Sequence, residues 1–565
     1  MHVHENRLVF SVRRRYAGTA TRVTPSDCGF ATDGKGRDMR DLGLWTAGTH
    51  REPRVPGRRI GTCRGHVAAI LCVLISALAL PAASHATEHE EPPTSFEPVL
   101  EAENFSITQQ RQAIYDTPGY QQRLAEQGLK NREEATTAQA ADPERNFSGD
   151  VCYEGENGCA GDVRLYDWEK NGYGRVRKVL FTARNGATIS AHIWSAVNPA
   201  TNPNAKLPGV VITNGSVQAD EQMYWYAAQA LAKDGYLVMT FDPQGQGQSD
   251  TFGQAPDEQE GFPAQSDGRP FFDGTEDAIN FFLSTPKRPY VPVPSCETGT
   301  SHAPKQNERV AKGLDAAYNP FWRELKSSQI GLAGHSYGAA GVSYIAQWDP
   351  RVKAVVGWDN LAAPDPNQKT GASGGGPAEK PCPSTPADRT IPPVTKPGLG
   401  MSADYFLPPT PNTSLPSPQG KSKETHAYSE AGVDSGEIII RGGSHLDFSF
   451  IPNQAFGASL RGADEIAWYT SAWFDKYVKG QTSADRRLLT NRWREDPLEA
   501  AVDLHHDGNA MSFYYYSRLD IHRASGEPFD CENLRKGCTG MFTEREPGSY
   551  SYLATDTSPL GFDKP

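Results

Sequence analysis

The sequence predicts an α/β fold with a mainly parallel central sheet flanked by helices, with lid-like insertions and a C-terminal extension. From residue 163 to about residue 480, short apolar runs alternate with amphipathic segments, as strands and their covering helices do. Within this span, the apolar run 330–333 meets the pentapeptide Gly-His-Ser-Tyr-Gly at 334–338, and a helix-forming stretch follows. Two long insertions, 287–320 and 361–397, interrupt the alternation, and we expect either lids or disordered loops there.

Apolar runs and turn residues mark the individual elements. Asn185-Gly186 is a strong turn dipeptide, so the first two strands should form a hairpin. Gly235 and Pro350 each end a helix. We expect strands at 175–184, 188–194, 209–213, 236–241, 329–333, 352–357, 398–402 and 437–440, and helices at 221–233, 276–283, from Ser336 to Pro350, and at 464–478.

The N-terminal region resembles an export signal preceded by foreign sequence. Residues 1–57 are rich in Arg and Gly and lack apolar periodicity, so we expect an over-extended reading frame. Residues 58–86 combine a basic start, an apolar core and small residues before Ala86, which predicts a signal peptide cleaved near Ala86. The core is short for a membrane span and no second long apolar run follows. We therefore expect a secreted protein with no stable membrane insertion.

The remaining chain divides by composition. Residues 87–150 are polar and rich in helix formers, which predicts an N-terminal arm. The α/β domain should occupy 151–480, and a C-terminal extension 481–565, with a strand at Tyr514 to Tyr516. Residues 1–86 hold 13 Lys and Arg against 6 Asp and Glu, so the mature chain should be more acidic than the formal net charge of -12 indicates. Such acidity argues against nucleic acid as a partner.

Six cysteines lie beyond the predicted signal peptide, an even number that suggests three disulfides in an oxidising compartment. Two equal short spacings favour Cys152 with Cys159 and Cys531 with Cys538, and elimination then leaves Cys296 with Cys382. Sequence alone leaves about fifteen connectivities open. No Cys-x-x-Cys spacing occurs, which disfavours a zinc site.

Three motifs in order resemble the α/β-hydrolase superfamily over about residues 170–480. The pentapeptide 334–338 is similar to the family's turn that carries the nucleophile, and the resemblance implies that role for Ser336. It implies an acid after a later strand, at Asp404, and a base after the last strand, at His445. Asp359 follows the preceding strand, another place where related hydrolases carry the acid, and stays an alternative to the favoured Asp404.

The same resemblance implies an oxyanion hole. One donor should be the backbone N–H of Tyr337, the residue after the nucleophile. The other should come from the loop 213–217, where Ser216 is the candidate and Asn214 stands where many relatives have histidine. The segment 241–250 resembles the Asp-x-x-Gly-x-Gly-x-Ser loop of these enzymes, with structural glycines.

Several nearby residues have a structural interpretation instead. A second match to Gly-x-Ser-x-Gly, at 371–375, lacks a strand before it and a helix after it. We expect His335 to point away from the reacting centre and Asp447 to support the histidine loop. Residues 224–226 (Tyr-Trp-Tyr) could line an acyl pocket, but helix packing is favoured.

The resemblance thus implies a secreted serine hydrolase that cleaves a small-molecule or lipid ester through an acyl-enzyme, without metal or organic cofactor. An amidase or peptidase on the same fold is the alternative within enzymes. A non-catalytic binding protein that keeps the fold is the alternative from another class, and loss of Ser336 or His445 would be its sign.

Overall fold

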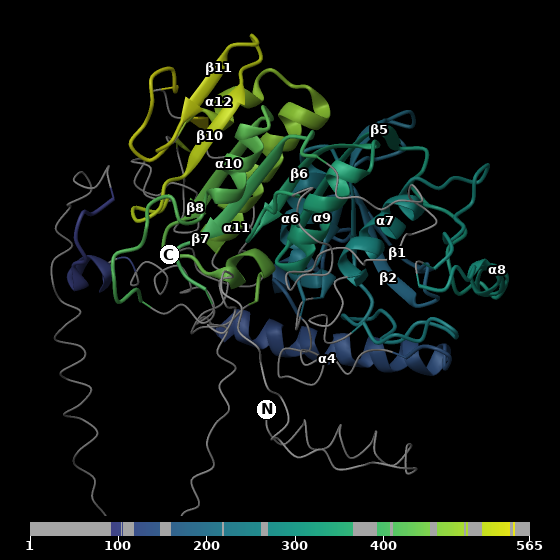
Figure 1. The fold of residues 1–565 in the computed structure, drawn as a ribbon. Helices are drawn as coiled ribbons and strands as arrows, with labels where there is room; N and C mark the ends of the chain where they lie inside the picture. The colour runs from purple at the N-terminus through teal and green to yellow at the C-terminus, as the bar shows by residue number, and fades with distance from the viewer. Residues whose placement is uncertain are drawn as a thin grey trace, which may run out of the picture. The chain divides into compact units, whose positions relative to one another are not determined.

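A ten-stranded mixed sheet forms the centre of the protein, in the order β1-β2-β4-β3-β5-β6-β7-β8-β10-β11 (Figure 1). The strands from β4 to β8 in this order are parallel, and antiparallel strands extend the sheet on both sides. Their bounds are β1 (Arg175–Thr182), β2 (Thr188–Ser195), β3 (Leu207–Thr213), β4 (Leu237–Phe241), β5 (Leu325–His335), β6 (Val352–Trp358), β7 (Gly398–Ala403), β8 (Ser435–Ile440), β10 (Arg518–His522) and β11 (Pro528–Cys531).

The structure is a computed structural model. It describes residues 92–102, 104, 118–146, 160–216, 220–261, 269–295, 297–364, 393–406, 411–451, 460–490, 493–494, 511–542 and 546–547. All of them belong to one compact unit, Ser84–Pro565. The predicted signal peptide and the segment before it lie outside the described residues.

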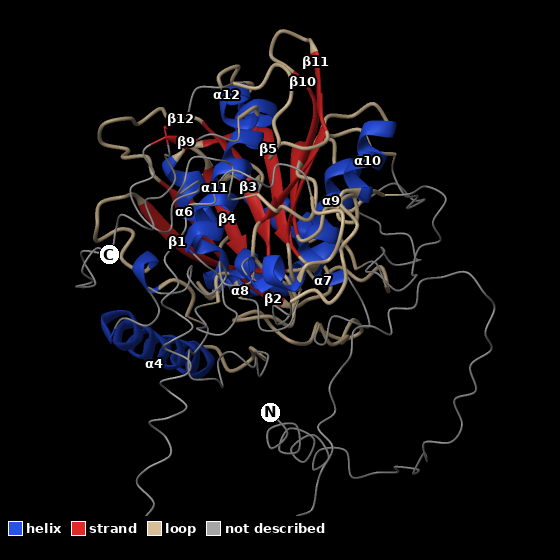
Figure 2. Ribbon diagram, turned by 90° about the vertical axis from the view of Figure 1, so that its left-hand side faces the viewer, coloured by secondary structure: helices blue, strands red, loops and turns tan. Residues whose placement is uncertain are grey.

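Helices cover both faces of the sheet (Figure 2). One face carries α6 (Trp225–Lys233) and α11 (Leu460–Phe474), and the other carries α7 (Arg269–Phe282), α9 (Tyr337–Trp348) and α10 (Lys423–Glu430). The central strands are therefore apolar on both sides, and every residue of β4 is buried. Two hydrophobic clusters, one on each face, form the core.

Strands occur at all eight predicted positions, and Gly186 turns the predicted hairpin with φ 84°. The helix predicted to begin at Glu221 starts as a 3-10 turn, Glu221–Tyr224, before α6. The helix predicted at 276–283 begins earlier, at Arg269. Downstream, α11 ends at Phe474 and continues as a π-helical segment, Asp475–Lys479.

The C-terminal extension adds two strands to the sheet. β10 pairs with β8, with Arg518 opposite Glu437. The predicted strand at Tyr514 to Tyr516 is wrong, because these residues bend ahead of β10, where the amides of Tyr514 and Tyr515 donate to Ser512 Oγ at 3.1 and 3.0 Å.

One of the predicted disulfides, Cys531–Cys538, is present and closes a loop directly after β11. The other two expected pairs, Cys152 with Cys159 and Cys296 with Cys382, lie outside the described residues.

The first insertion packs against the edge of the sheet. It contains α8 (Ala303–Ala311), which lies beside β1. Thr182, at the end of β1, anchors the insertion through two hydrogen bonds. The Thr182 amide donates to Gln306 Oε1 at 2.7 Å, and the Thr182 carbonyl accepts from the Tyr290 hydroxyl at 3.0 Å. Most of the second insertion, residues 365–392, lies outside the described residues, and a lid role stays a prediction for both.

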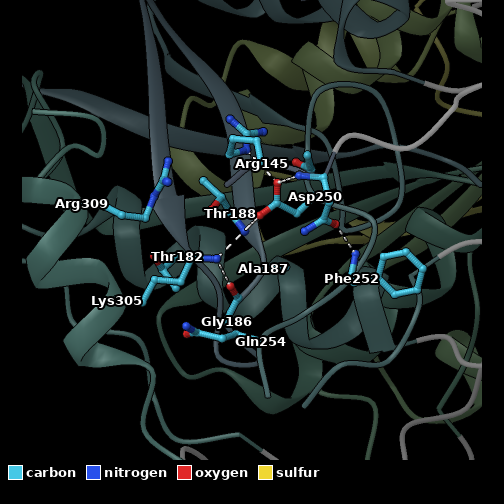
Figure 3. A network of polar contacts seen from close by, with 12 residues as sticks. Arg145, Thr182, Gly186, Ala187, Thr188, Asp250, Phe252, Gln254, Lys305 and Arg309 are labelled. Atoms are coloured by element: carbon cyan, nitrogen blue, oxygen red, sulfur yellow. Dashed lines mark hydrogen bonds and ion pairs between the residues drawn. The ribbon is translucent and has the colours of Figure 1, made fainter. Parts of the chain in front are cut away.

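The arm helix α4 (Pro118–Ala141) runs along the lower side of the body in Figure 1 and buries Tyr120 and Leu124. Buried charges attach its end to the sheet edge (Figure 3). Arg145 Nε donates to Asp250 Oδ1 at 2.7 Å, and the two side chains are 3% and 0% exposed. Asp250 also accepts from the Thr188 amide at 2.8 Å, so it joins the arm to the β1–β2 hairpin.

No helix in the described part of the chain has the length and apolar character needed to cross a membrane.

The Arg145–Asp250 pair should contribute strongly to stability. Asp250→Asn should lower the free energy of unfolding by about 3 kcal/mol, because it removes the carboxylate charge to which the buried Arg145 donates. Urea unfolding followed by tryptophan fluorescence measures the change. Lys312→Met is the control, because it removes an exposed pair with Glu308, and no measurable shift is expected. Equal changes in the free energy of unfolding of the two variants would contradict the importance of the buried Arg145–Asp250 pair.

Candidate active site

The sheet has a crossover point where polar side chains can gather. In the sheet, β4 lies on one side of β3 and β5 lies on the other, and all three strands are parallel. The carboxyl ends of β3 and β5 are therefore neighbours at the point where the connections that follow them run in opposite directions. Crevices of this kind are the usual ligand sites of α/β sheets. Ser216 follows β3 and Ser336 follows β5, which brings both predicted residues to this point.

Ser336 stands in a strained turn between β5 and α9, with φ 56° and ψ -120°. The two motif glycines permit this turn. A Cβ on Gly338 would lie 2.4 Å from the Thr213 carbonyl oxygen, and one on Gly334 would lie 2.5 Å from the Gly338 carbonyl oxygen. The turn therefore packs directly on the end of β3 and leaves Ser336 half-buried. The second motif match, 371–375, lies outside the described residues.

His445 and Asp359 form a close polar contact. His445 Nδ1 lies 2.5 Å from Asp359 Oδ2, and their side chains are 11% and 8% exposed. Burial raises the pKa of Asp359, but the hydrogen bond and the charge of His445 outweigh it and hold that pKa below its ordinary value. An ionised Asp359 accepts the Nδ1–H, so Nε2 is the nitrogen able to accept a proton.

Ser336 and His445 lie on neighbouring loops. Among the described residues, no hydrogen bond joins the Ser336 hydroxyl to His445. Such bonds are often long without substrate and tighten when it binds.

Among the described residues, no hydrogen bond or ion pair joins Asp404 to His445. Its Oδ2 accepts from the Gly442 amide at 2.7 Å and from Asn104 Nδ2 at 3.0 Å. Asp404 thus holds the turn that precedes His445 and ties it to the N-terminal arm. The carboxylate of Asp359, the alternative acid, points at the imidazole, while that of Asp404 is directed at a backbone amide.

His335 joins the two loops of the site. Its Nδ1 lies 2.8 Å from the Tyr224 hydroxyl, which accepts from the Gly215 amide at 3.0 Å. Its ring centroid lies 4.4 Å from that of His445. Burial and the neighbouring His445 charge lower the pKa of His335 well below its ordinary value, so it stays neutral. The His335 ring thus lies beside that of His445, contrary to the expectation that it points away from the reacting centre, because its hydrogen bond to Tyr224 holds it between the two loops.

The candidate oxyanion donors lie on the two loops that meet at Ser336. Tyr337 is the first residue of α9, where the backbone N–H has no partner within the helix. The other loop passes close by, because a Cβ on Gly215 would lie 3.2 Å from Ser336 Cβ. The Gly215 amide is occupied by Tyr224, which leaves Ser216 as the candidate in this loop. Asn214 turns away and donates to Asp242 Oδ1 at 3.1 Å.

The structural interpretations of the neighbouring residues agree with the contacts. Tyr224, Trp225 and Tyr226 are all buried, and the Tyr224 hydroxyl bonds to Gly215 and His335. Asp447 Oδ2 accepts from the Ser444 amide at 2.7 Å and so closes the histidine loop. Asn104 donates a hydrogen bond to Asp404, and the sequence analysis missed it because it lies 300 residues from Asp404 and no local pattern marks it.

A buried carboxyl group, Glu437, lies in β8 near Asp359. It is 2% exposed, and its Oε1 accepts from Ser402 Oγ at 2.5 Å. Gly400 makes room for it, since a Cβ there would lie 2.0 Å from Glu437 Oε2. Burial raises the pKa of Glu437 to about 8, and the charge of Asp359 adds to this rise.

In the described part of the chain, no three His, Cys, Asp or Glu side chains form a group that could hold a metal ion.

Comparison with known proteins gives a limited result. No protein-family model matches the chain. A curated protein from Fusarium sp., named Hydrolase LUC6, is 36% identical over 76 residues, which cover 14% of this chain and 18% of that protein. The chain therefore matches less than a fifth of that relative's length. This short similarity and the mixed α/β sheet fit a hydrolase in general, and they do not specify the bond that is cleaved.

The contact between Gly338 and β3 can be tested with an alanine pair. Gly338→Ala should abolish any activity at Ser336 and lower the melting temperature, because its Cβ would meet the Thr213 and Asn214 carbonyls at 2.4 and 2.3 Å. Gly274→Ala in α7 is the matched control, because the nearest atom to its Cβ lies 3.7 Å away. Alanine should keep or raise stability there. Labelling of Ser336 with a fluorophosphonate probe measures the activity, and thermal unfolding measures the stability. A Gly338→Ala protein that keeps its activity would refute the packing argument.

Glu437 should make stability depend on pH. Its folded pKa of about 8 lies above the ordinary 4.5, so the folded state holds this proton more tightly and loses stability as pH rises between these values. Glu437→Gln has no proton to lose, so its stability relative to the wild type should increase from about pH 5 to about pH 8. Urea unfolding across this range measures it, with the exposed Glu430→Gln as control. A stability difference between Glu437→Gln and the wild type that does not change with pH would exclude the effect.

Proposed function

We propose that the protein is a serine hydrolase of the α/β-hydrolase fold that cleaves carboxylic esters. The observation that carries the proposal is the 2.5 Å contact between His445 Nδ1 and Asp359 Oδ2, at the same sheet edge as the strained Ser336 turn. The strand order supports the fold assignment, since Ser336 follows β5 at the crossover point. In this proposal Asp359 takes the role of the acid, and Asp404 positions the histidine turn.

Acylation begins with attack of Ser336 Oγ on the ester carbonyl carbon. The hydroxyl proton moves to His445 Nε2, and Asp359 stabilises the imidazolium that forms. The carbonyl oxygen becomes an oxyanion, which the backbone N–H groups of Tyr337 and Ser216 stabilise. The bond to the alcohol oxygen then breaks, and that oxygen takes the proton from His445.

Deacylation repeats the sequence with water. His445 Nε2 accepts a proton as the water oxygen bonds to the acyl carbon. The bond from Ser336 Oγ to the acyl group breaks, Oγ regains the proton, and the carboxylic acid leaves. Buried, neutral His335 keeps the two loops together through Tyr224 without exchanging a proton in either step.

We further propose that the protein acts after export, with the signal peptide removed near Ala86. The Cys531–Cys538 disulfide is compatible with an oxidising compartment.

The test is labelling of the purified protein with a fluorophosphonate probe, with mass spectrometry to locate the adduct. Labelling should occur at Ser336 and vanish in Ser336→Ala. Asp359→Asn should slow it by about 10³- to 10⁴-fold, because the imidazole loses its orienting carboxylate. Asp404→Asn, the matched control, should have a small effect, because an amide oxygen can still accept from Gly442.

Three other outcomes would change the assignment. A large loss in Asp404→Asn with little in Asp359→Asn would restore Asp404 as the acid. Absence of labelling in folded protein would favour a non-catalytic binding protein. Faster turnover of amides than of matched esters would favour an amidase or peptidase.

A further inference from the structure

One exposed aromatic ring stands beside the candidate base. Phe406 lies three residues beyond the end of β7, and its side chain is 52% exposed. Its ring centroid lies 5.0 Å from that of His445, with the ring planes tilted by 43°. The other ring beside His445 belongs to His335, which is 3% exposed. Of these two rings, only that of Phe406 is accessible to a substrate.

The backbone that carries Phe406 is fixed on both sides of the neighbouring Tyr405. The Tyr405 hydroxyl donates to Glu101 Oε1 at 2.7 Å and accepts from Asn104 Nδ2 at 2.8 Å. The Tyr405 amide donates to the Gly443 carbonyl at 3.0 Å, in the turn before His445. The backbone next to Phe406 is thus held by the N-terminal arm and the histidine turn, so binding of a ligand to the ring needs little ordering of this backbone.

The part of the substrate near Phe406 follows from the proposed function, on which this inference rests. His445 must give its proton to the oxygen of the departing alcohol, so that oxygen lies next to the imidazole. The oxyanion donors, Tyr337 and Ser216, instead lie on the loops after β5 and β3. A ring in contact with His445 is therefore next to the alcohol side of the ester.

We infer that Phe406 binds the alcohol portion of the substrate and that the site favours esters of aromatic alcohols over those of small aliphatic alcohols. An aromatic alcohol group can pack against the Phe406 ring edge-to-face or offset while its oxygen receives the proton from His445. Covering the exposed ring also removes apolar surface from water, which stabilises this arrangement. The acyl group makes no contact with Phe406.

Two esters of one acid test the inference, because they differ only in the alcohol. The wild-type kcat/KM for benzyl acetate should exceed that for ethyl acetate, and Phe406→Ala should reduce this ratio by roughly tenfold. Phe406→Leu keeps an apolar side chain without the ring and should give an intermediate ratio. Phe252→Ala is the matched control, because Phe252 is the other exposed phenylalanine of the described residues, at 44%. It should leave the ratio unchanged.

Deacylation separates substrate binding from a general effect on His445. The acetyl-enzyme no longer carries an alcohol, so the steady-state rate after the burst with 4-nitrophenyl acetate should be the same in Phe406→Ala and wild type. An unchanged benzyl-to-ethyl ratio, or equal slowing of acylation and deacylation, would overturn the inference while Ser336 labelling upheld the proposed function. Absence of both labelling and ester hydrolysis would overturn both.

Discussion

The close contact between Gly338 and the end of β3 is the constraint on which the candidate site depends. It presses the turn after β5 onto the Thr213 and Asn214 carbonyls, so that no side chain fits at position 338. This contact fixes Ser336 at the point where the sheet connections diverge and places the Gly215–Ser216 loop beside it. Tyr224 and His335 then connect the two loops by hydrogen bonds. The strain at Ser336 persists because packing on both sides determines the turn.

Two aspartates at the same sheet edge have different contacts. Asp359 faces the His445 imidazole, whereas Asp404 binds the Gly442 amide before it. One carboxylate can therefore orient the ring while the other orients the backbone that carries the ring. The arm takes part through Asn104 and Glu101, which hold Asp404 and Tyr405. Residues before the sheet thus support the loop that presents Phe406, and the N-terminal arm becomes part of the site.

Although the chain is acidic, buried Arg–Asp ion pairs join segments that are far apart in the sequence. Arg145 and Asp250 connect the end of α4 to the β1–β2 hairpin, and Arg309 of α8 pairs with Asp142 and Asp315. Arg309 lies between two carboxylates, of which Asp142 is 167 residues away, whereas Arg145 bonds to Asp250, 105 residues away (Figure 3). Burying such charges costs desolvation free energy, which is offset only when the two partners meet in the correct geometry. The pairs therefore make the position of the arm specific.

The sequence by itself determined the α/β class, the strand positions from β1 to β8, the Ser336 turn and the Cys531–Cys538 pair, because apolar runs, turn residues and short cysteine spacings act locally. It also placed His445 after the last parallel strand. It favoured Asp404 over Asp359 as the acid, although both follow strands that end at the same edge and a spacing does not say where a carboxylate points. It missed Asn104 and Phe406 as well. Only the tertiary structure showed the contacts of Asp359 with His445, of Asn104 with Asp404 and of Phe406 with His445, because each joins segments distant in the chain, where packing and hydrogen bonds select one partner among several that the sequence allows.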